Sequence, residues 1–73
     1  MKRKYQHIIF AIIEKYEPIP LTSSEIFQEA IELGYDDRKV RFAFNEMIDK
    51  RLLLKDWIMG KKTIKFNDEV SLV

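Results

Sequence analysis

The 73-residue sequence contains no cysteine, which excludes disulfide bonds and cysteine-ligated metal sites. Its single histidine, His7, leaves no Cys–His pair for catalysis and no histidine cluster for zinc. No apolar run is long enough to cross a bilayer, and the apolar stretch after the basic start is too short for a signal peptide. We therefore expect an intracellular protein that is not an enzyme, binds no cofactor or metal, and does not enter a membrane.

Apolar residues make up 47% of the sequence, as in a globular domain and unlike a disordered chain. The length predicts one domain over residues 1–73, with a core over about 5–66 and a tail over 67–73. The net charge is only +1, but residues 14–37 carry seven acids and one lysine, and residues 38–65 carry nine bases and three acids. This polarity suggests a basic surface in the second half of the chain, although an ordinary mixed surface is the alternative.

Apolar residues recur at helical spacing over residues 2–16 and predict a first helix there. This helix ends at Glu17, because Pro18 disfavours a helical conformation before it. The two prolines make residues 18–21 extended, and a short edge strand is expected there. Phe10 lies off the centre of the apolar stripe, so it covers the domain edge or meets a partner chain. The apolar residues of this helix are Tyr5, Ile8, Ile9, Ile12, Ile13 and Tyr16.

A second helix begins after Thr22, which forms a capping-box pattern with Glu25. It runs to about Leu33 and ends at Gly34, the residue type that most often follows a helix. Its expected buried residues are Ile26, Phe27, Ala30 and Leu33.

A third helix begins at Asp36 or Asp37, either of which can cap it, and runs to about Lys50 or Arg51. With the second helix and the short glycine turn between them, it makes a helix-turn-helix pattern. Its inner face, within about −60° to +80° of Val40 on a helical wheel, is apolar. That face consists of Val40, Ala43, Phe44, Met47 and Ile48.

The outer face of this third helix is the part of the sequence that most clearly suggests a function. Arg38, Phe42, Asn45 and Asp49 lie opposite the inner face, at about 140° to 200° on the same wheel, and Arg41 lies nearby. Arginine can bind guanine, asparagine can bind adenine, and phenylalanine can pack on a thymine methyl group. Two readings compete with base recognition: a protein-binding face, and a face that is only solvated. The acids Glu46 and Asp49 count against DNA binding.

The last part of the core reads as a β-hairpin, because two apolar-rich runs (residues 52–59 and 62–66) flank Gly60 and Lys61. A two-residue turn at Gly60 and Lys61 is expected, and a three-residue loop, shifting the first strand by one residue, is also compatible. Lys61 and Lys62 at the tip can contact phosphates. The expected cross-strand pairs are Trp57 with Ile64 and Asp56 with Lys65.

This order of elements, and above all the run from Val40 to Leu53, resembles the winged helix-turn-helix superfamily of DNA-binding domains. Val40 and Arg41 match a frequent Val-Arg pair, and Phe44 and Met47 take two Leu-like positions. Arg51 stands where glycine is common. The resemblance covers residues 5–66 and implies an α+β fold of three helices and a two-stranded wing. It also implies that the third helix enters the major groove while the wing contacts the flanking backbone or minor groove.

The sequence and the resemblance together predict a protein that binds double-stranded DNA as a homodimer and regulates transcription. The first helix, through Phe10, or the C-terminal tail would supply the dimer contact. The alternative is a winged-helix module that binds another protein through Phe42 and the acidic second helix. The candidate DNA-binding residues are Arg38, Lys39, Arg41, Phe42 and Asn45 on the helix 37–51, and Lys61 and Lys62 on the wing 54–66.

Overall fold

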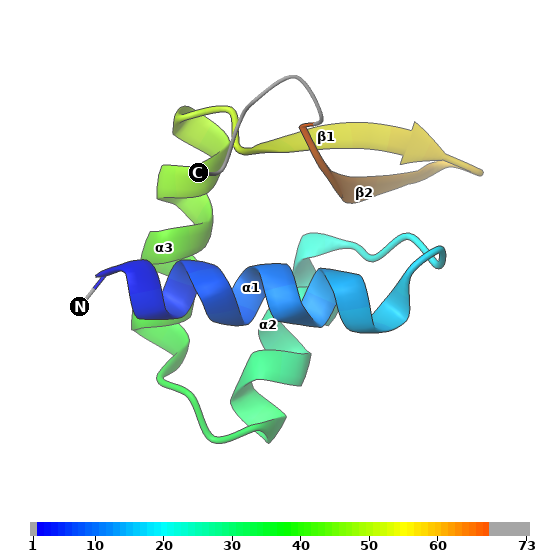
Figure 1. The fold of residues 1–73 in the computed structure, drawn as a ribbon. Coiled ribbons are helices and arrows are strands. Elements are labelled where there is room, and N and C mark those ends of the chain that lie inside the picture. Colours follow the sequence, from blue (N-terminus) through cyan, green and yellow to red (C-terminus); the bar gives the residue numbers. More distant parts are fainter. Residues whose placement is uncertain (1, 68–73) are drawn as a thin grey trace.

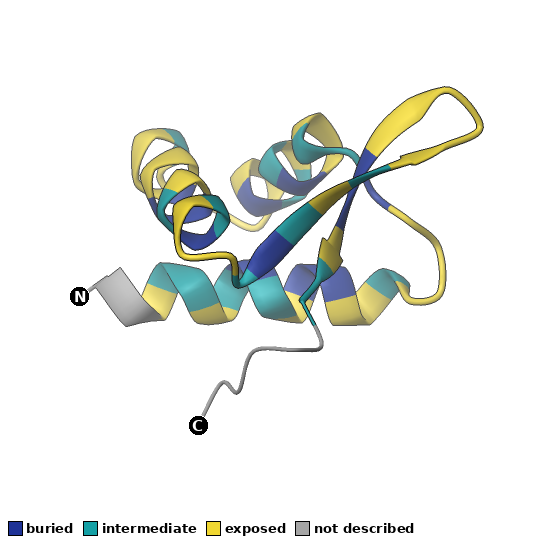
Figure 2. Ribbon diagram, turned by 90° about the horizontal axis from the view of Figure 1, so that it is seen from above, coloured by how far each residue is buried: buried dark blue, intermediate teal, exposed yellow. Residues whose placement is uncertain are grey.

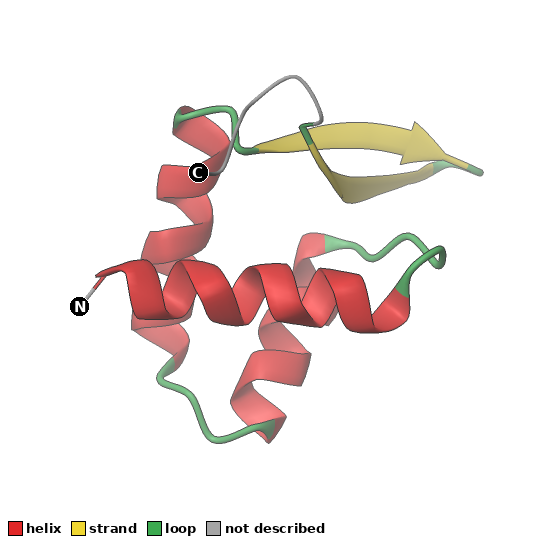
Figure 3. Ribbon diagram, viewed as in Figure 1, coloured by secondary structure: helices red, strands yellow, loops and turns green. Residues whose placement is uncertain are grey.

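Three helices followed by a two-stranded antiparallel hairpin make up residues 2–67, the part of the chain that this computed structural model describes (Figures 1 and 3). The predicted α+β class and element order are thereby confirmed. The tail predicted for residues 67–73 lies, beyond Asn67, outside the described residues. The elements are α1 (Lys2–Tyr16), α2 (Ser23–Glu32), α3 (Asp37–Asp49), β1 (Leu53–Ile58) and β2 (Lys61–Phe66).

The beginning of α2 follows the predicted capping box. The Thr22 hydroxyl accepts a hydrogen bond from the backbone N–H of Glu25, and the backbone N–H of Thr22 donates to the Glu25 carboxylate at 2.8 Å. At the other end, Gly34 has φ of +95° and follows the C-cap residue Leu33. The prediction that Leu33 is buried is wrong, because its cap position turns the side chain to solvent and leaves it 55% exposed.

The ends of α3 are also capped within the chain. Asp36, one of the two predicted caps, accepts hydrogen bonds from the backbone N–H groups of Arg38 and Lys39. The helix ends with Lys50 as C-cap, and Arg51 follows with φ of 60°, in the left-handed region that favours glycine. The turn thus takes the conformation of a glycine exit although the residue is arginine.

One face of each helix supplies the core, and Figure 2 shows these buried stretches turned toward the interior. α1 packs against both α2 and α3, and the base of the hairpin closes the core. The inner face predicted for α3 is confirmed at four positions, and Ile48 is half-buried. The buried apolar residues are Ile9, Ile12, Ile13, Leu21, Ile26, Ala30, Val40, Ala43, Phe44, Met47, Leu53 and Ile64.

The register of the hairpin differs from the prediction by two residues. The two-residue turn consists of Met59 and Gly60, both with positive φ (51° and 81°), so that Trp57 pairs with Lys62 and not with Ile64. Turns of this kind need a left-handed residue at both central positions and favour glycine at the second, which places Gly60 second and not first. Because the shift is an even number, it does not move any side chain from one face of the hairpin to the other. Asp56 likewise pairs with Thr63 in the register, although its side chain still forms the expected ion pair with Lys65, at 3.9 Å.

The segment between α1 and α2 joins the hairpin at one point. The backbone N–H of Ile64 donates to the carbonyl of Leu21 at 2.8 Å, which makes an isolated antiparallel bridge. The short strand expected over residues 18–21 is limited to this bridge. Phe10 packs its ring against Phe66, with centroids 5.3 Å apart, so it covers the domain edge, one of the two roles predicted for it.

Candidate nucleic-acid interface

α3 has two sharply different faces. Its inner face is almost fully buried against α1, α2 and the hairpin base, which fixes the rotation of the helix about its own axis. All five residues predicted to contact DNA from this helix are exposed, and they come from the outward half of the wheel. They are Arg38, Lys39, Arg41, Phe42 and Asn45.

Arg41 lies on the flank of α3 that faces α2. Its Nε donates to Oδ1 of Asp37 at 2.9 Å, one helical turn earlier. Its guanidinium carbon also stands 4.6 Å from the ring centroid of Phe27 on α2, in a cation–π contact. Arg41 is therefore held beside α2, and the outward pole of α3 is left to Arg38, Phe42 and Asn45.

The acid Glu46, which counted against a DNA-binding face, is turned toward α1. Its Oε1 accepts a hydrogen bond from Nε2 of Gln6 at 3.1 Å, and its side chain is half-buried. The charge of Glu46 consequently sits at the α1–α3 contact and not on the outward pole. Asp49 remains exposed at the last turn of α3 and is the acid that a bound phosphate would meet.

The hairpin tip carries Lys61 and Lys62, and both are exposed as predicted. The Lys62 Nζ lies 5.5 Å from the ring centroid of Trp57, its cross-strand partner. The tip also exposes large apolar side chains that sequence reasoning did not single out: Trp57 is 68% exposed and Met59 is 97% exposed. The signal was present in the sequence, because a Trp-Ile-Met run directly precedes the turn glycine.

The structure does not place the tip lysines beside the outward residues of α3. In both Figure 1 and Figure 2, α3 lies toward one side of the molecule and the hairpin tip projects from the other. The molecule measures 32 × 27 × 19 Å, so its longest dimension is close to one turn of a DNA duplex, about 34 Å. The two basic regions can thus reach separate places along one duplex.

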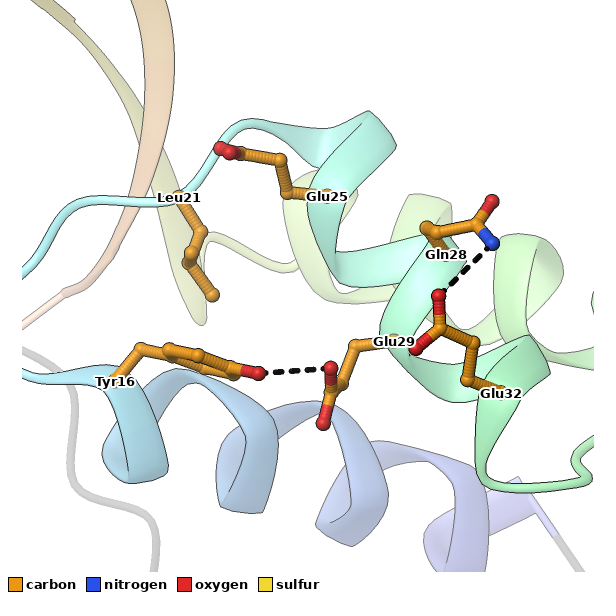
Figure 4. A pocket seen from close by; sticks show the side chains of 6 residues that line it. All are labelled: Tyr16, Leu21, Glu25, Gln28, Glu29 and Glu32. Atoms are coloured by element: carbon orange, nitrogen blue, oxygen red, sulfur yellow. Dashed lines mark hydrogen bonds between the residues drawn. The ribbon is translucent and has the colours of Figure 1, made fainter.

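The acidic part of the chain lines a shallow hollow of about 210 Å³ between the end of α1 and α2 (Figure 4). Glu29, at its centre, accepts hydrogen bonds from the Lys15 ammonium at 2.9 Å and from the Tyr16 hydroxyl at 2.8 Å. The hydrogen bond from Lys15, and then that from Tyr16, lower the pKa of Glu29. The same contacts raise the pKa values of Lys15 and Tyr16. This network ties α1 to α2, and the further acids Glu25 and Glu32 give that side of the molecule a negative charge.

Two further findings concern sites of other kinds. Within residues 2–67, no helix is both long and apolar enough to span a bilayer. In the same part of the chain, no group of three or more His, Cys, Asp or Glu side chains is arranged to hold a metal ion.

Comparisons of the chain with protein-family models, with curated proteins and with solved structures found no significant match.

Proposed function

We propose that the protein binds double-stranded DNA as a winged helix-turn-helix domain, acting as a small dimeric transcriptional regulator. The observation that supports this function best is the division of α3 into a buried apolar face and an exposed face rich in base-reading side chains. In this proposal α3 lies in the major groove, and the hairpin is the wing that contacts the flanking backbone. The proposed contacts come from Arg38, Lys39, Arg41, Phe42, Asn45, Lys61 and Lys62.

The contacts of each side chain indicate which residues would contact bases and which would contact phosphates. Arg38 and Asn45, on the outward pole, would read base edges, since arginine matches guanine and asparagine matches adenine. Arg41 is held on the α2 flank by Asp37 and Phe27, so it would bind a phosphate at the edge of the groove. Lys61 and Lys62, at the hairpin tip, would bind phosphates flanking the groove that α3 enters.

A dimer is part of the proposal, because one domain of this size makes few contacts and two copies can read half-sites one helical turn apart. Phe10 is used within the domain by its contact with Phe66. The C-terminal route to a dimer, through residues 68–73, lies outside the described residues. Sedimentation of the protein with and without a duplex measures the number of copies bound.

Salt-dependent binding to duplexes tests this function. Affinity should fall steeply with salt, because each bound lysine or arginine releases counterions from the duplex. Lys61→Ala with Lys62→Ala should weaken binding to all sequences and reduce the slope of log affinity against log salt by about two. Lys15→Ala, on the acidic side of the molecule, is the matched control and should leave the slope unchanged.

Sequence preference tests the major-groove part separately. Selection from a random duplex pool should return a preferred site for the unmodified protein. Arg38→Ala with Asn45→Ala should lose about 1–3 kcal/mol of discrimination at each base read, while the salt slope changes by about one. An unchanged preferred site in this double variant would refute the role given to α3.

A protein-binding module is the second candidate, and the exposed apolar side chains favour it. Phe42 is 57% exposed and Trp57 is 68% exposed, and aromatic residues are enriched at protein interfaces. This function predicts no duplex binding even at low salt, together with a protein partner whose capture is lost on Phe42→Ala. An anisotropy titration against duplex at two salt concentrations separates the two candidates.

A further inference from the structure

The tip of the hairpin exposes apolar surface that the fold does not require. Met59 is 97% exposed and occupies the first turn position with φ of 51°, a conformation that a side chain such as methionine rarely adopts. Asparagine or glycine adopts this positive-φ turn conformation more readily, and either would expose less apolar surface to water. Next to it, Trp57 is 68% exposed and Ile58 is 39% exposed. Neither turn chemistry nor core packing accounts for three consecutive apolar residues here.

Lysines lie along both strands of the hairpin, and two of them, Lys61 and Lys62, lie next to the turn. β1 and β2 carry Lys55, Lys61, Lys62 and Lys65 against the single acid Asp56. Lys62 holds its ammonium over the Trp57 ring, and Asp56 lies 3.9 Å from Lys65. An apolar point between cationic flanks is complementary to a ligand with an apolar interior between two rows of anions. Duplex DNA is such a ligand, since stacked bases lie between two phosphate strands.

We propose that the hairpin tip is an apolar wedge that enters the minor groove and inserts Met59 between adjacent base pairs, so that the duplex bends. This inference rests on the proposed DNA-binding function and goes beyond phosphate contacts by the tip lysines. Methionine and isoleucine are among the residues that unstack a base step from the minor groove, kinking DNA by about 20–90°. Trp57 and Ile58 directly precede Met59 in the chain and would cover the opened step.

The geometry of the turn fits this role. Met59 and Gly60 form the whole connection between the strands, so the tip is as narrow as a hairpin allows, and the Met59 side chain is 97% exposed. Lys61 and Lys62 directly follow the turn, where they would bind phosphates as the tip enters. Steps that unstack easily, such as TA, are the expected insertion points.

Energy transfer between dyes at the two ends of a duplex of about 20 base pairs tests the wedge, with binding followed separately by anisotropy. The duplex carries one central TA step flanked by 2-aminopurine, whose fluorescence rises when its neighbours unstack. At saturation and low salt, the unmodified protein should increase both energy transfer and 2-aminopurine fluorescence. Met59→Asn should bind about ten- to hundredfold more weakly, as loss of a buried methionine predicts, and should produce neither signal.

Two controls keep the result interpretable. Met59→Leu preserves an apolar tip and should still bend the duplex, whereas Lys61→Ala should weaken binding without removing the bend at saturation. Met59→Asn makes an Asn-Gly turn, so its thermal unfolding temperature should equal or exceed that of the unmodified protein.

The possible outcomes separate the wedge from the function on which it rests. Equal bending by Met59→Asn and the unmodified protein, or saturated binding without any bend, overturns the wedge and leaves DNA binding intact. Absence of binding at low salt by anisotropy overturns the proposed function, and the wedge with it.

Discussion

Arg51 and Gly34 occupy equivalent positions after two helices, which allows a matched pair of opposite substitutions. After α2, the N–H of Gly34 bonds to the carbonyl of Ile31, and after α3 the N–H of Arg51 bonds to that of Ile48. Both residues have positive φ, at 95° and 60°. The left-handed conformation costs an L-residue about 1–2 kcal/mol. Glycine avoids this cost, but it lowers the stability of the fold by about 0.5–1 kcal/mol because it has more conformational entropy to lose on folding. Arg51→Gly should therefore stabilise the domain by about 0.5–1 kcal/mol.

The reverse substitution, Gly34→Ala, should destabilise the domain by a similar amount. A Cβ at Gly34 would have no atom within 4 Å, so only the backbone conformation contributes to the cost. For a domain of this size, these changes move the unfolding temperature by about 2–8 °C, upward for Arg51→Gly and downward for Gly34→Ala.

Circular dichroism melts of the two variants and the unmodified protein measure this contrast. The Asn67 side-chain amide donates a hydrogen bond to the backbone carbonyl of Arg51 at 2.7 Å. Arg51→Gly retains this carbonyl, so the hydrogen bond is not lost. If Arg51→Gly lowers the unfolding temperature, the arginine side chain stabilises the fold by more than its backbone conformation costs, and the reasoning is refuted.

Two further predictions concern the core and the α1–α2 contact. Phe44 is 4% exposed and its ring meets that of Phe27 edge to face. Phe44→Ala should therefore lower the free energy of unfolding by about 3–5 kcal/mol and leave the domain largely unfolded at 37 °C, as measured by circular dichroism. An unfolding temperature within a few degrees of that of the unmodified protein would contradict this. The lowered pKa of Glu29 stabilises the fold above the ordinary carboxyl pKa, and this stabilisation is lost as pH falls through the folded-state value. The difference in unfolding temperature between the unmodified protein and Glu29→Gln should hence shrink from pH ~6 to pH ~3. A constant difference would show that the hydrogen bonds from Lys15 and Tyr16 do not depend on the negative charge of Glu29.

Local chemistry made most of the fold predictable from the sequence. The caps at Thr22 and Asp36, the glycine exit at Gly34 and the buried stripe of α3 depend on residues within one or two turns of one another. The predicted hairpin register was wrong because the type of turn, and not the presence of glycine alone, decides which two residues occupy the central positions of the turn. Gly60 takes the second position, which leaves Met59 in a conformation that its residue type does not suggest.

The candidate interface was less predictable, because side-chain contacts between helices decide where charges point. The wheel placed Arg41 and Glu46 near the outward face but could not show which neighbours they meet. The Asp37–Arg41 ion pair has the i,i+4 spacing that a sequence can show. Arg41 contacts the Phe27 ring on α2, and Glu46 accepts a hydrogen bond from the Gln6 amide on α1. These contacts join different helices, so they could not be predicted without the packing of the helices.

These contacts change what the charge pattern along the chain means. Lys15, Tyr16 and Glu29 form a hydrogen-bonded network that serves the α1–α2 contact, and Glu46 is bound at the α1–α3 contact. If the protein binds DNA as proposed, the acids that remain exposed on α2 would repel phosphates from that side. A duplex approaching the molecule would then be directed to α3 and the hairpin, where Arg38 and the tip lysines lie. Orientation on DNA would in this way depend on the acidic side of the domain as much as on the basic one.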